Sequence, residues 1–120
     1  MIQKAKKGEE IRVVGDMFMS PTYTKDVART LKKFLELKPE FGVYHMTNEG
    51  FCSWYEFTKA IFEILGWDVE IKPIKSSELK RLAKRPQFSA LKNKKLEELG
   101  LRMRSWIDAL SEYLKEKGYL

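Results

Sequence analysis

The sequence has very few of the residues that form disulfides or bind metals. Its 120 residues include one cysteine, Cys52, and one histidine, His45. A single cysteine excludes an intramolecular disulfide. The two residues flank a turn, and as a zinc site they lack the remaining ligands, so we expect no metal. A nucleophile–base pair would need a third orienting group. We therefore interpret His45 as a packed or hydrogen-bonded core residue and Cys52 as a small apolar filler.

Long hydrophobic stretches are also missing. No apolar run approaches the roughly 20 residues that a membrane span needs, and residues 1–7 have no apolar signal core. We therefore expect a cytoplasmic protein that does not interact with membranes. Lys and Arg number 23 against 17 Asp and Glu, a net charge of +6, which favours anionic ligands in general. Nucleic acid is not expected, because no recognised motif is present and the aromatic residues lie at core spacings.

A third absence concerns nucleotide cofactors. No glycine-rich loop lies between a strand and a helix, so the chain has neither a dinucleotide fingerprint nor a P-loop. We expect that this chain by itself binds no cofactor. With 120 residues, 43% of them hydrophobic, it has the size of one domain with a modest core. We therefore predict a single lobe over residues 1–120.

Strand-like and helix-like patterns alternate along the chain. The β-branched run at residues 11–14 predicts a strand. Ser53 and Glu56 have the spacing of a capping box, which predicts the start of a helix that Gly66 ends. Similar patterns predict strands at Phe41–Thr47 and Val69–Ile74, and helices from Thr22 or Thr24 to near Leu37, from Ser76 or Ser77 to Leu82, over Asn93–Leu99 and from Ser105 onward. The predicted fold is a small helix-rich α/β lobe whose strands are too few for a self-contained doubly wound sheet.

Two positions are candidates for binding a ligand. Arg85 stands beside Pro86, and its guanidinium fork matches phosphate oxygens while the proline restricts the backbone. The alternative is a surface arginine before a turn. Asp16 ends a strand and begins an apolar loop, which is where open α/β folds place ligand contacts. It could equally cap the backbone amides of that loop.

Four segments, in this order, resemble the C-terminal part of the dTDP-4-dehydrorhamnose reductases, which are extended short-chain dehydrogenase/reductases. The resemblance runs from about Glu10 to about Leu114. The segments are Val13-Val14-Gly15-Asp16 with the stretch from Ser20 to Ala28, Gly42-Val43-Tyr44-His45 with Asn48 and Gly50, Ser53-Trp54-Tyr55-Glu56-Phe57, and Arg85-Pro86-Gln87-Phe88-Ser89-Ala90-Leu91 with Lys95-Leu96.

The resemblance implies that the complete enzyme is a reductase and that this chain contributes the binding of its substrate. Family enzymes reduce the 4-keto group of dTDP-6-deoxy-L-lyxo-4-hexulose to give dTDP-L-rhamnose. They use NADPH or NADH held by an N-terminal Rossmann domain, which also carries the catalytic residues and has no counterpart in this sequence. This chain would then be the substrate-binding lobe without catalytic residues. Arg85 would bind the diphosphate, and Asp16, Pro21 and Thr22 would shape the loop nearest the sugar.

One departure from the family pattern lies in that loop. Met17 and Met19 stand where the family usually has a glutamine and then a glycine, so an amide's hydrogen bonds and a glycine's conformational freedom are both lost. The expected partners are a dTDP-sugar and the missing Rossmann domain or a partner chain, and a homodimer is a further option. The alternative function is a non-catalytic regulatory or protein-interaction module of the same fold.

Overall fold

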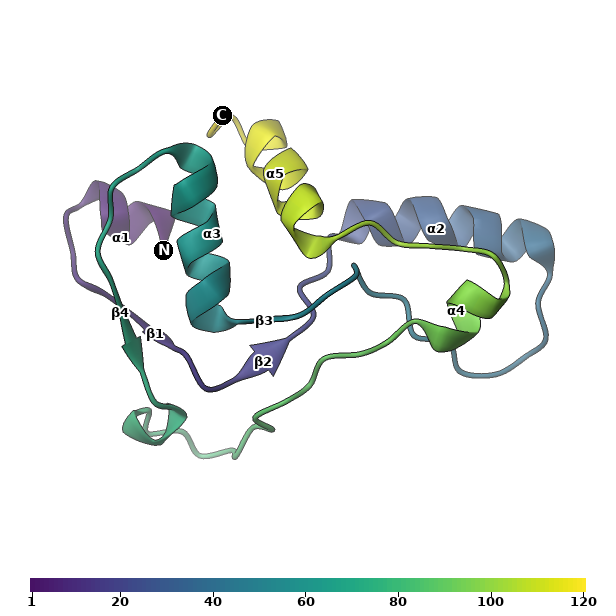
Figure 1. Cartoon of the computed structure of the whole chain (residues 1–120), viewed down its shortest axis with the longest axis horizontal. Helices are drawn as coiled ribbons and strands as arrows, with labels where there is room; N and C mark the ends of the chain where they lie inside the picture. Colours follow the sequence, from purple (N-terminus) through teal and green to yellow (C-terminus); the bar gives the residue numbers. More distant parts are fainter. The chain divides into compact units, whose positions relative to one another are not determined.

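The computed structural model describes residues 1–120 and confirms the predicted fold class, a helix-rich α/β chain with short strands (Figure 1). In chain order the elements are α1 (Ile2–Lys6), β1 (Ile11–Val14), β2 (Phe18–Met19), α2 (Thr24–Leu37), β3 (Cys52–Ser53), α3 (Trp54–Leu65), β4 (Ile71–Ile74), the 3-10 helix η1 (Ser76–Glu78), α4 (Lys94–Glu98) and α5 (Trp106–Glu116). The chain divides into two compact units: unit 1 comprises Met1–Met19 and Cys52–Ser89, and unit 2 comprises Ser20–Phe51 and Ala90–Leu120.

Unit 1 is built around a parallel strand pair. β1 pairs with β4, with Ile11 opposite Ile71 and Val14 opposite Ile74. A parallel pair requires a crossover connection, and α3 lies in that crossover and packs against both strands. The buried apolar residues of this unit are Ile11, Val13, Val14, Met17, Cys52, Ile61 and Phe62. The strand predicted at residues 11–14 is confirmed as β1. The strand predicted at Val69–Ile74 forms as β4, which begins two residues later than predicted.

The predicted start and end of α3 are confirmed, but only one of the two reciprocal hydrogen bonds of the predicted capping box forms. The Ser53 hydroxyl accepts a hydrogen bond from the Glu56 backbone N–H at 3.0 Å, and Gly66 ends the helix with a φ of 70°. Cys52, next to this cap, is fully buried. Burial, and then the charge of Glu56, raise the pKa of its thiol to about 12. The interpretation of Cys52 as an apolar filler is therefore confirmed, because a neutral buried thiol is a poor nucleophile.

The helix predicted from Ser76 to Leu82 is wrong beyond its first turn. Only η1 forms, and the chain is extended at Leu79, with φ −90° and ψ 120°. The Glu78 carboxylate accepts a hydrogen bond from the Lys75 N–H at 2.7 Å, which closes this single turn. Leu82 is fully exposed. A longer helix would need an apolar face to bury, and this segment buries none.

Unit 2 contains α2, α4 and α5, and the predicted ends of these helices are mostly confirmed. α2 ends at Leu37 as expected, and the Ser105 hydroxyl caps α5 by accepting from the Asp108 N–H at 3.2 Å. The predicted cap of α2 by Thr22 or Thr24 is wrong. The side chain of Asn48, distant in sequence, accepts from the Tyr23 N–H at 2.7 Å instead.

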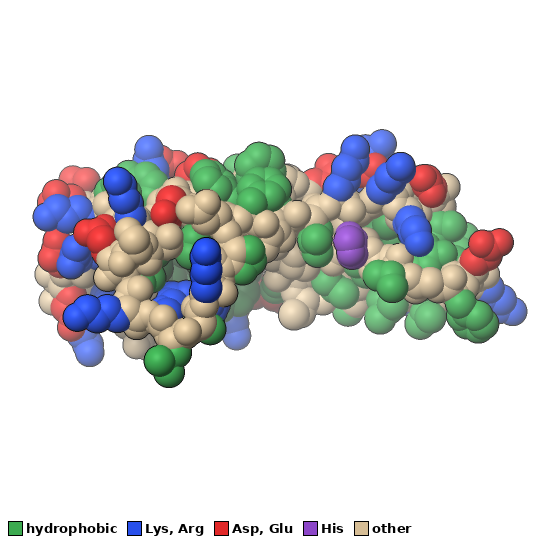
Figure 2. Space-filling view, turned by 90° about the horizontal axis from the view of Figure 1, so that it is seen from below, with side chains coloured by type: hydrophobic (Ala, Val, Ile, Leu, Met, Phe, Trp, Pro, Cys, Tyr) green, Lys and Arg blue, Asp and Glu red, His purple; other side chains and the backbone are tan.

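The strand predicted at residues 41–47 does not form. The backbone groups of residues 42–46 make no hydrogen bond with any part of the chain. The Tyr44 ring packs edge-on against Phe34 with ring centroids 4.8 Å apart, whereas Val43 and His45 are exposed. Figure 2 shows the single histidine at the surface, so its predicted place in the core is also wrong. A strand exists only with a hydrogen-bonded neighbour, and unit 2 offers none here.

Candidate functional site

Arg85 lines a pocket of about 620 Å³ in unit 1. The segment 81–87 forms one side of it, and Met17, Ser76, Ser77 and Leu79 complete the lining. Its volume lies within the range of small-molecule sites, about 300–1,000 Å³. The predicted phosphate-binding arginine therefore borders a space large enough for a ligand.

Strand β2 fixes the end of the segment that carries Arg85. The Phe18 N–H donates to the Gln87 carbonyl at 2.7 Å, and the Ser89 N–H donates to the Phe18 carbonyl at 2.9 Å. The rings of Phe18 and Phe88 lie 6.3 Å apart. These contacts anchor the chain two residues after Arg85, and Pro86 restricts the backbone between. The arginine thus stands at the edge of an ordered, strand-like stretch.

Positive charge dominates the lining of this pocket. Arg81, Lys84 and Arg85 all border it, and no carboxylate does. None of the three makes an ion pair or hydrogen bond with another residue of the chain. Unpaired guanidinium and ammonium groups around a cavity favour an anionic ligand.

Asp16 is held by the first residue of η1. Its two carboxylate oxygens accept from the Ser76 N–H and from the Ser76 hydroxyl, each at 2.9 Å. Asp16 therefore caps η1 across the chain rather than the amides of its own loop, and through Ser76 it supports the wall of the pocket. Its predicted contact with a substrate stays a prediction.

Pro21 and Thr22 belong to unit 2, whereas Arg85 and Asp16 belong to unit 1. The Thr22 hydroxyl donates to the Ser20 carbonyl at 3.0 Å, and the Ser20 hydroxyl accepts from the Leu91 N–H at 3.0 Å. These bonds order the loop before α2. The predicted role of Pro21 and Thr22 near a sugar stays a prediction.

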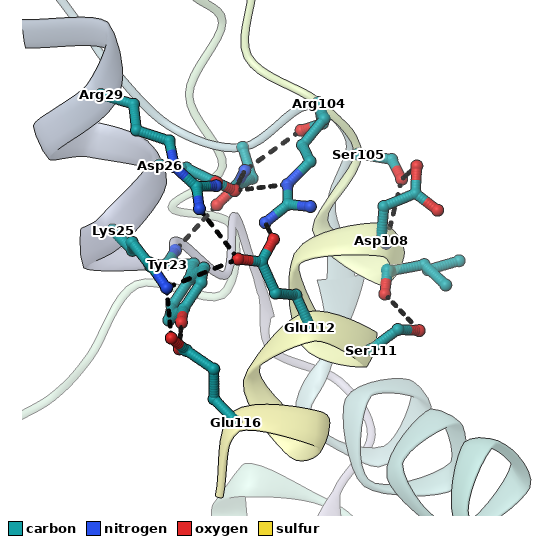
Figure 3. Close-up of polar contacts among 12 residues, drawn as sticks. Tyr23, Lys25, Asp26, Arg29, Arg104, Ser105, Asp108, Ser111, Glu112 and Glu116 are labelled. Atoms are coloured by element: carbon teal, nitrogen blue, oxygen red, sulfur yellow. Dashed lines mark hydrogen bonds and ion pairs between the residues drawn. The ribbon is translucent and has the colours of Figure 1, made fainter. Parts of the chain in front are cut away.

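A second group of polar residues, in unit 2, surrounds the buried carboxylate of Asp26 (Figure 3). It accepts from Arg104 Nε at 2.8 Å, from Asn48 Nδ2 at 2.8 Å and from Arg29 at 3.3 Å. Burial alone would raise the pKa of Asp26, but the hydrogen bonds from Arg104 and Asn48 outweigh it and the pKa is lowered. The carboxylate is therefore held in its charged form.

The same group extends to two carboxylates of α5. Glu112 accepts from Arg29 at 3.0 Å and also pairs with Arg104. Hydrogen bonds from these two arginines lower the pKa of Glu112 to about 2. Glu116 pairs with Lys25 and accepts from the Tyr23 hydroxyl. Because each charge has a partner, we interpret this cluster as the link between the start of α2 and α5. No local pattern predicts this cluster, since its members lie up to 93 residues apart in the sequence.

The structure contains no group of three or more His, Cys, Asp or Glu side chains that could hold a metal ion. None of its helices has the length and apolar character that crossing a bilayer requires. The pocket of unit 1 is the candidate binding site because Arg81, Lys84 and Arg85 border it.

Comparisons with known proteins agree with the sequence resemblance. A family model described as the RmlD substrate binding domain matches residues 1–118. The spore coat polysaccharide biosynthesis protein SpsK of Bacillus subtilis (strain 168) is 43% identical over 117 residues, which cover 98% of this chain and 41% of SpsK. A dTDP-4-dehydrorhamnose reductase of Mycolicibacterium smegmatis is 35% identical over 104 residues, which cover 85% of this chain and 32% of that enzyme.

Solved structures give the same result. The dTDP-4-dehydrorhamnose reductase of Clostridium acetobutylicum matches 98% of this chain with a TM-score of 0.90 and 38% identity. The Bacillus anthracis enzyme, solved in complex with NADP, matches 96% with a TM-score of 0.88 and 36% identity. The chain belongs to the RmlD substrate-binding domain family, as its sequence predicted. It spans about two fifths of these relatives, 42% and 41% of the two solved chains.

Proposed function

We propose that this chain is the substrate-binding lobe of an RmlD-type reductase and binds a dTDP-sugar in dTDP-L-rhamnose biosynthesis. Units 1 and 2 would act together as that single lobe, which the family match over residues 1–118 supports. The lobe contributes no catalytic residue and no cofactor contact. NADPH or NADH would be bound by a separate Rossmann domain. The observation that carries the proposal is the pocket beside Arg85, with three unpaired cations and no carboxylate.

Arg85 is the residue on which this proposal depends. A guanidinium binds phosphate oxygens by charge-assisted hydrogen bonds, each contributing about 1.5–3 kcal/mol. Removing it should therefore weaken binding by about 10-fold to 100-fold. Because Arg85 is exposed and makes no hydrogen bond or ion pair within the chain, its replacement should leave stability nearly unchanged.

Calorimetric titration of the chain with dTDP-rhamnose, and separately with NADPH, tests the proposal. We expect the chain to bind the sugar nucleotide, Arg85→Ala to weaken this binding by about 10-fold to 100-fold, and NADPH not to bind. Arg102→Ala is the matched control, because Arg102 is exposed in unit 2 and only approaches Glu49 at 4.0 Å. Equal affinities for the two variants, or no dTDP-rhamnose binding by the unsubstituted chain, would contradict the proposal.

An exposed apolar surface on unit 2 supports the need for a further domain. Leu31 and Leu35 on α2 are exposed, as are Phe41 and Val43 in the segment that follows. Residues 42–46 also leave their backbone donors and acceptors unused. Apolar side chains beside a bare backbone favour the addition of a strand to another sheet. We propose that the Rossmann domain supplies this sheet, since the relatives are more than twice as long as this chain.

Co-expression with the unmatched part of SpsK tests this docking surface. We expect a complex that co-purifies with the chain and that Leu35→Asp or Val43→Asp disrupts. Leu120→Asp is the control, because Leu120 is also an exposed leucine but lies outside α2 and the segment that follows it. A stable complex combined with no affinity for dTDP-sugars would instead favour the alternative function, a non-catalytic interaction module.

A further inference from the structure

The loop that precedes Arg85 concentrates positive charge. Lys80, Arg81, Lys84 and Arg85 lie within six residues, and none of them has a partner in the chain. Three of these four residues line the pocket, and Lys80 does not. Among the other cations of unit 1, Arg12 approaches Glu78 at 3.9 Å and Lys72 approaches Glu10 at 3.4 Å, whereas Lys4 and Lys7 have no acidic partner. The pocket is therefore lined by three cations, Arg81, Lys84 and Arg85, that form no ion pair within the chain.

A second cavity in the same unit shows the contrast. It has about 470 Å³ and is lined by Lys72 together with four carboxylate residues, Glu9, Glu10, Asp68 and Glu70. Acids outnumber the single lysine there, so that cavity has the opposite charge and does not favour an anion. The pocket beside Arg85 has three cations and no acid. Of these two cavities, only the one beside Arg85 has a lining that favours an anion.

The remaining lining suits a phosphate group. Ser76 is occupied with Asp16, but the neighbouring Ser77 hydroxyl has no partner in the chain and remains available as a donor. The backbone groups of residues 80–86 make no hydrogen bond, whereas Leu79 and Gln87 are anchored at either end. The loop is therefore held at its ends and its cations are able to adjust to a ligand between them.

We infer that Arg81 and Lys84 bind the diphosphate of a nucleotide together with Arg85. This inference rests on the proposed function and extends it from one residue to a three-cation site. Two guanidinium groups and one ammonium group match a diphosphate better than a single phosphate. In a diphosphate, each phosphate can bind its own arginine, and the two phosphates can share the lysine. The site should consequently recognise the diphosphate itself, and discriminate against a single phosphate.

Titration of the full chain with dTDP, dTMP and inorganic pyrophosphate tests the inference. We expect dTDP and pyrophosphate to bind, and dTMP to bind at least about 10-fold more weakly. Arg81→Ala should weaken dTDP binding by about 10-fold and Lys84→Ala by somewhat less. Lys80→Ala is the matched control, since it removes the same charge from the same loop outside the pocket, and it should change affinity by less than about 2-fold. Thermal melts of all variants should coincide, because these exposed side chains make no hydrogen bond or ion pair in the fold.

The possible failures are distinguishable. If Arg85→Ala weakens binding but Arg81→Ala and Lys84→Ala behave like Lys80→Ala, this inference is wrong and the proposed function stands. If all four variants weaken binding equally, the attraction is unspecific and the inference is wrong. Equal affinity for dTMP and dTDP would also overturn it. If the unsubstituted chain binds neither dTDP nor pyrophosphate, the inference and the proposed function fail together.

Discussion

Replacing Asp26 by asparagine should destabilise unit 2. The carboxylate is 6% exposed and accepts hydrogen bonds from Arg104, Asn48 and Arg29. An asparagine side chain offers one oxygen, so its NH₂ group would face at least one donor. One arginine or amide would then lose its acceptor, and the charge that balances two guanidinium groups would also be lost.

The magnitude follows from the exposure of the partners. Breaking a fully buried ion pair costs about 3–5 kcal/mol. The side chains of Arg104 and Arg29 are 33% and 52% exposed, so water solvates them when the carboxylate is gone. We therefore expect a loss of about 2 kcal/mol in the free energy of unfolding. For a chain of this size that corresponds to a fall in Tm of about 8 °C.

Urea unfolding followed by tryptophan fluorescence and circular dichroism measures this change. Asp68→Asn is the matched control, because Asp68 is exposed and has no partner in the chain. It should alter stability by less than about 0.5 kcal/mol. If Asp26→Asn is as mild as Asp68→Asn, the cluster around Asp26 does not stabilise the fold and the reasoning is refuted.

The pH dependence provides a second measurement of the same cluster. The pKa of Asp26 is lowered in the folded chain, and that of Glu112 falls from 4.5 to about 2. A carboxyl group with a lowered folded pKa stabilises the protein above its unfolded pKa, and this stabilisation is lost as pH falls through the folded value. The chain should therefore lose stability between about pH 4.5 and pH 2, and Asp26→Asn should make that loss smaller. An unchanged pH profile in Asp26→Asn would contradict the assignment.

Two further predictions concern single residues. The thiol of Cys52, buried and with a pKa of about 12, should react with iodoacetamide at pH 8 only after urea unfolds the chain, and rapid labelling of the folded chain would show that it is accessible. Gly50→Ala should cost about 2 kcal/mol, because Gly50 has a φ of 92° and a Cβ there would lie 3.1 Å from the Trp106 ring. Gly118→Ala, at a φ of 78° with open space around it, should cost about half as much in the same unfolding assay.

Local signals in the sequence predicted the elements whose causes are local. The β-branched run at residues 11–14, the cap at Ser53 and the cap at Ser105 each act within a few residues, and each is present in the structure. The stop at Gly66 is equally local, because glycine readily takes the left-handed conformation. Such features need no knowledge of distant segments.

Predictions failed where the deciding partner lies elsewhere in the chain. The amide of Asn48, not a nearby threonine, completes the start of α2. The segment 41–47 has the composition of a strand but no neighbour in unit 2 with which to pair. Propensity indicates that a backbone is suited to a strand, but a hydrogen-bonded neighbour is required for one to form.

The sequence by itself determined the family of this protein and the elements whose signals are local, such as β1 and the caps of α3 and α5. It also led to the proposal that Arg85 binds a phosphate. These depend on residue identity and spacing along the chain. Only the tertiary structure decided that Arg81 and Lys84 share a pocket with Arg85 while Lys80 does not, that Asp16 supports its wall, and that Asp26 is neutralised by arginines. Hydrogen bonds and Coulomb forces act over a few ångströms of space. Residues far apart in sequence, such as Asp26 and Arg104, become partners only when the fold brings them within that distance.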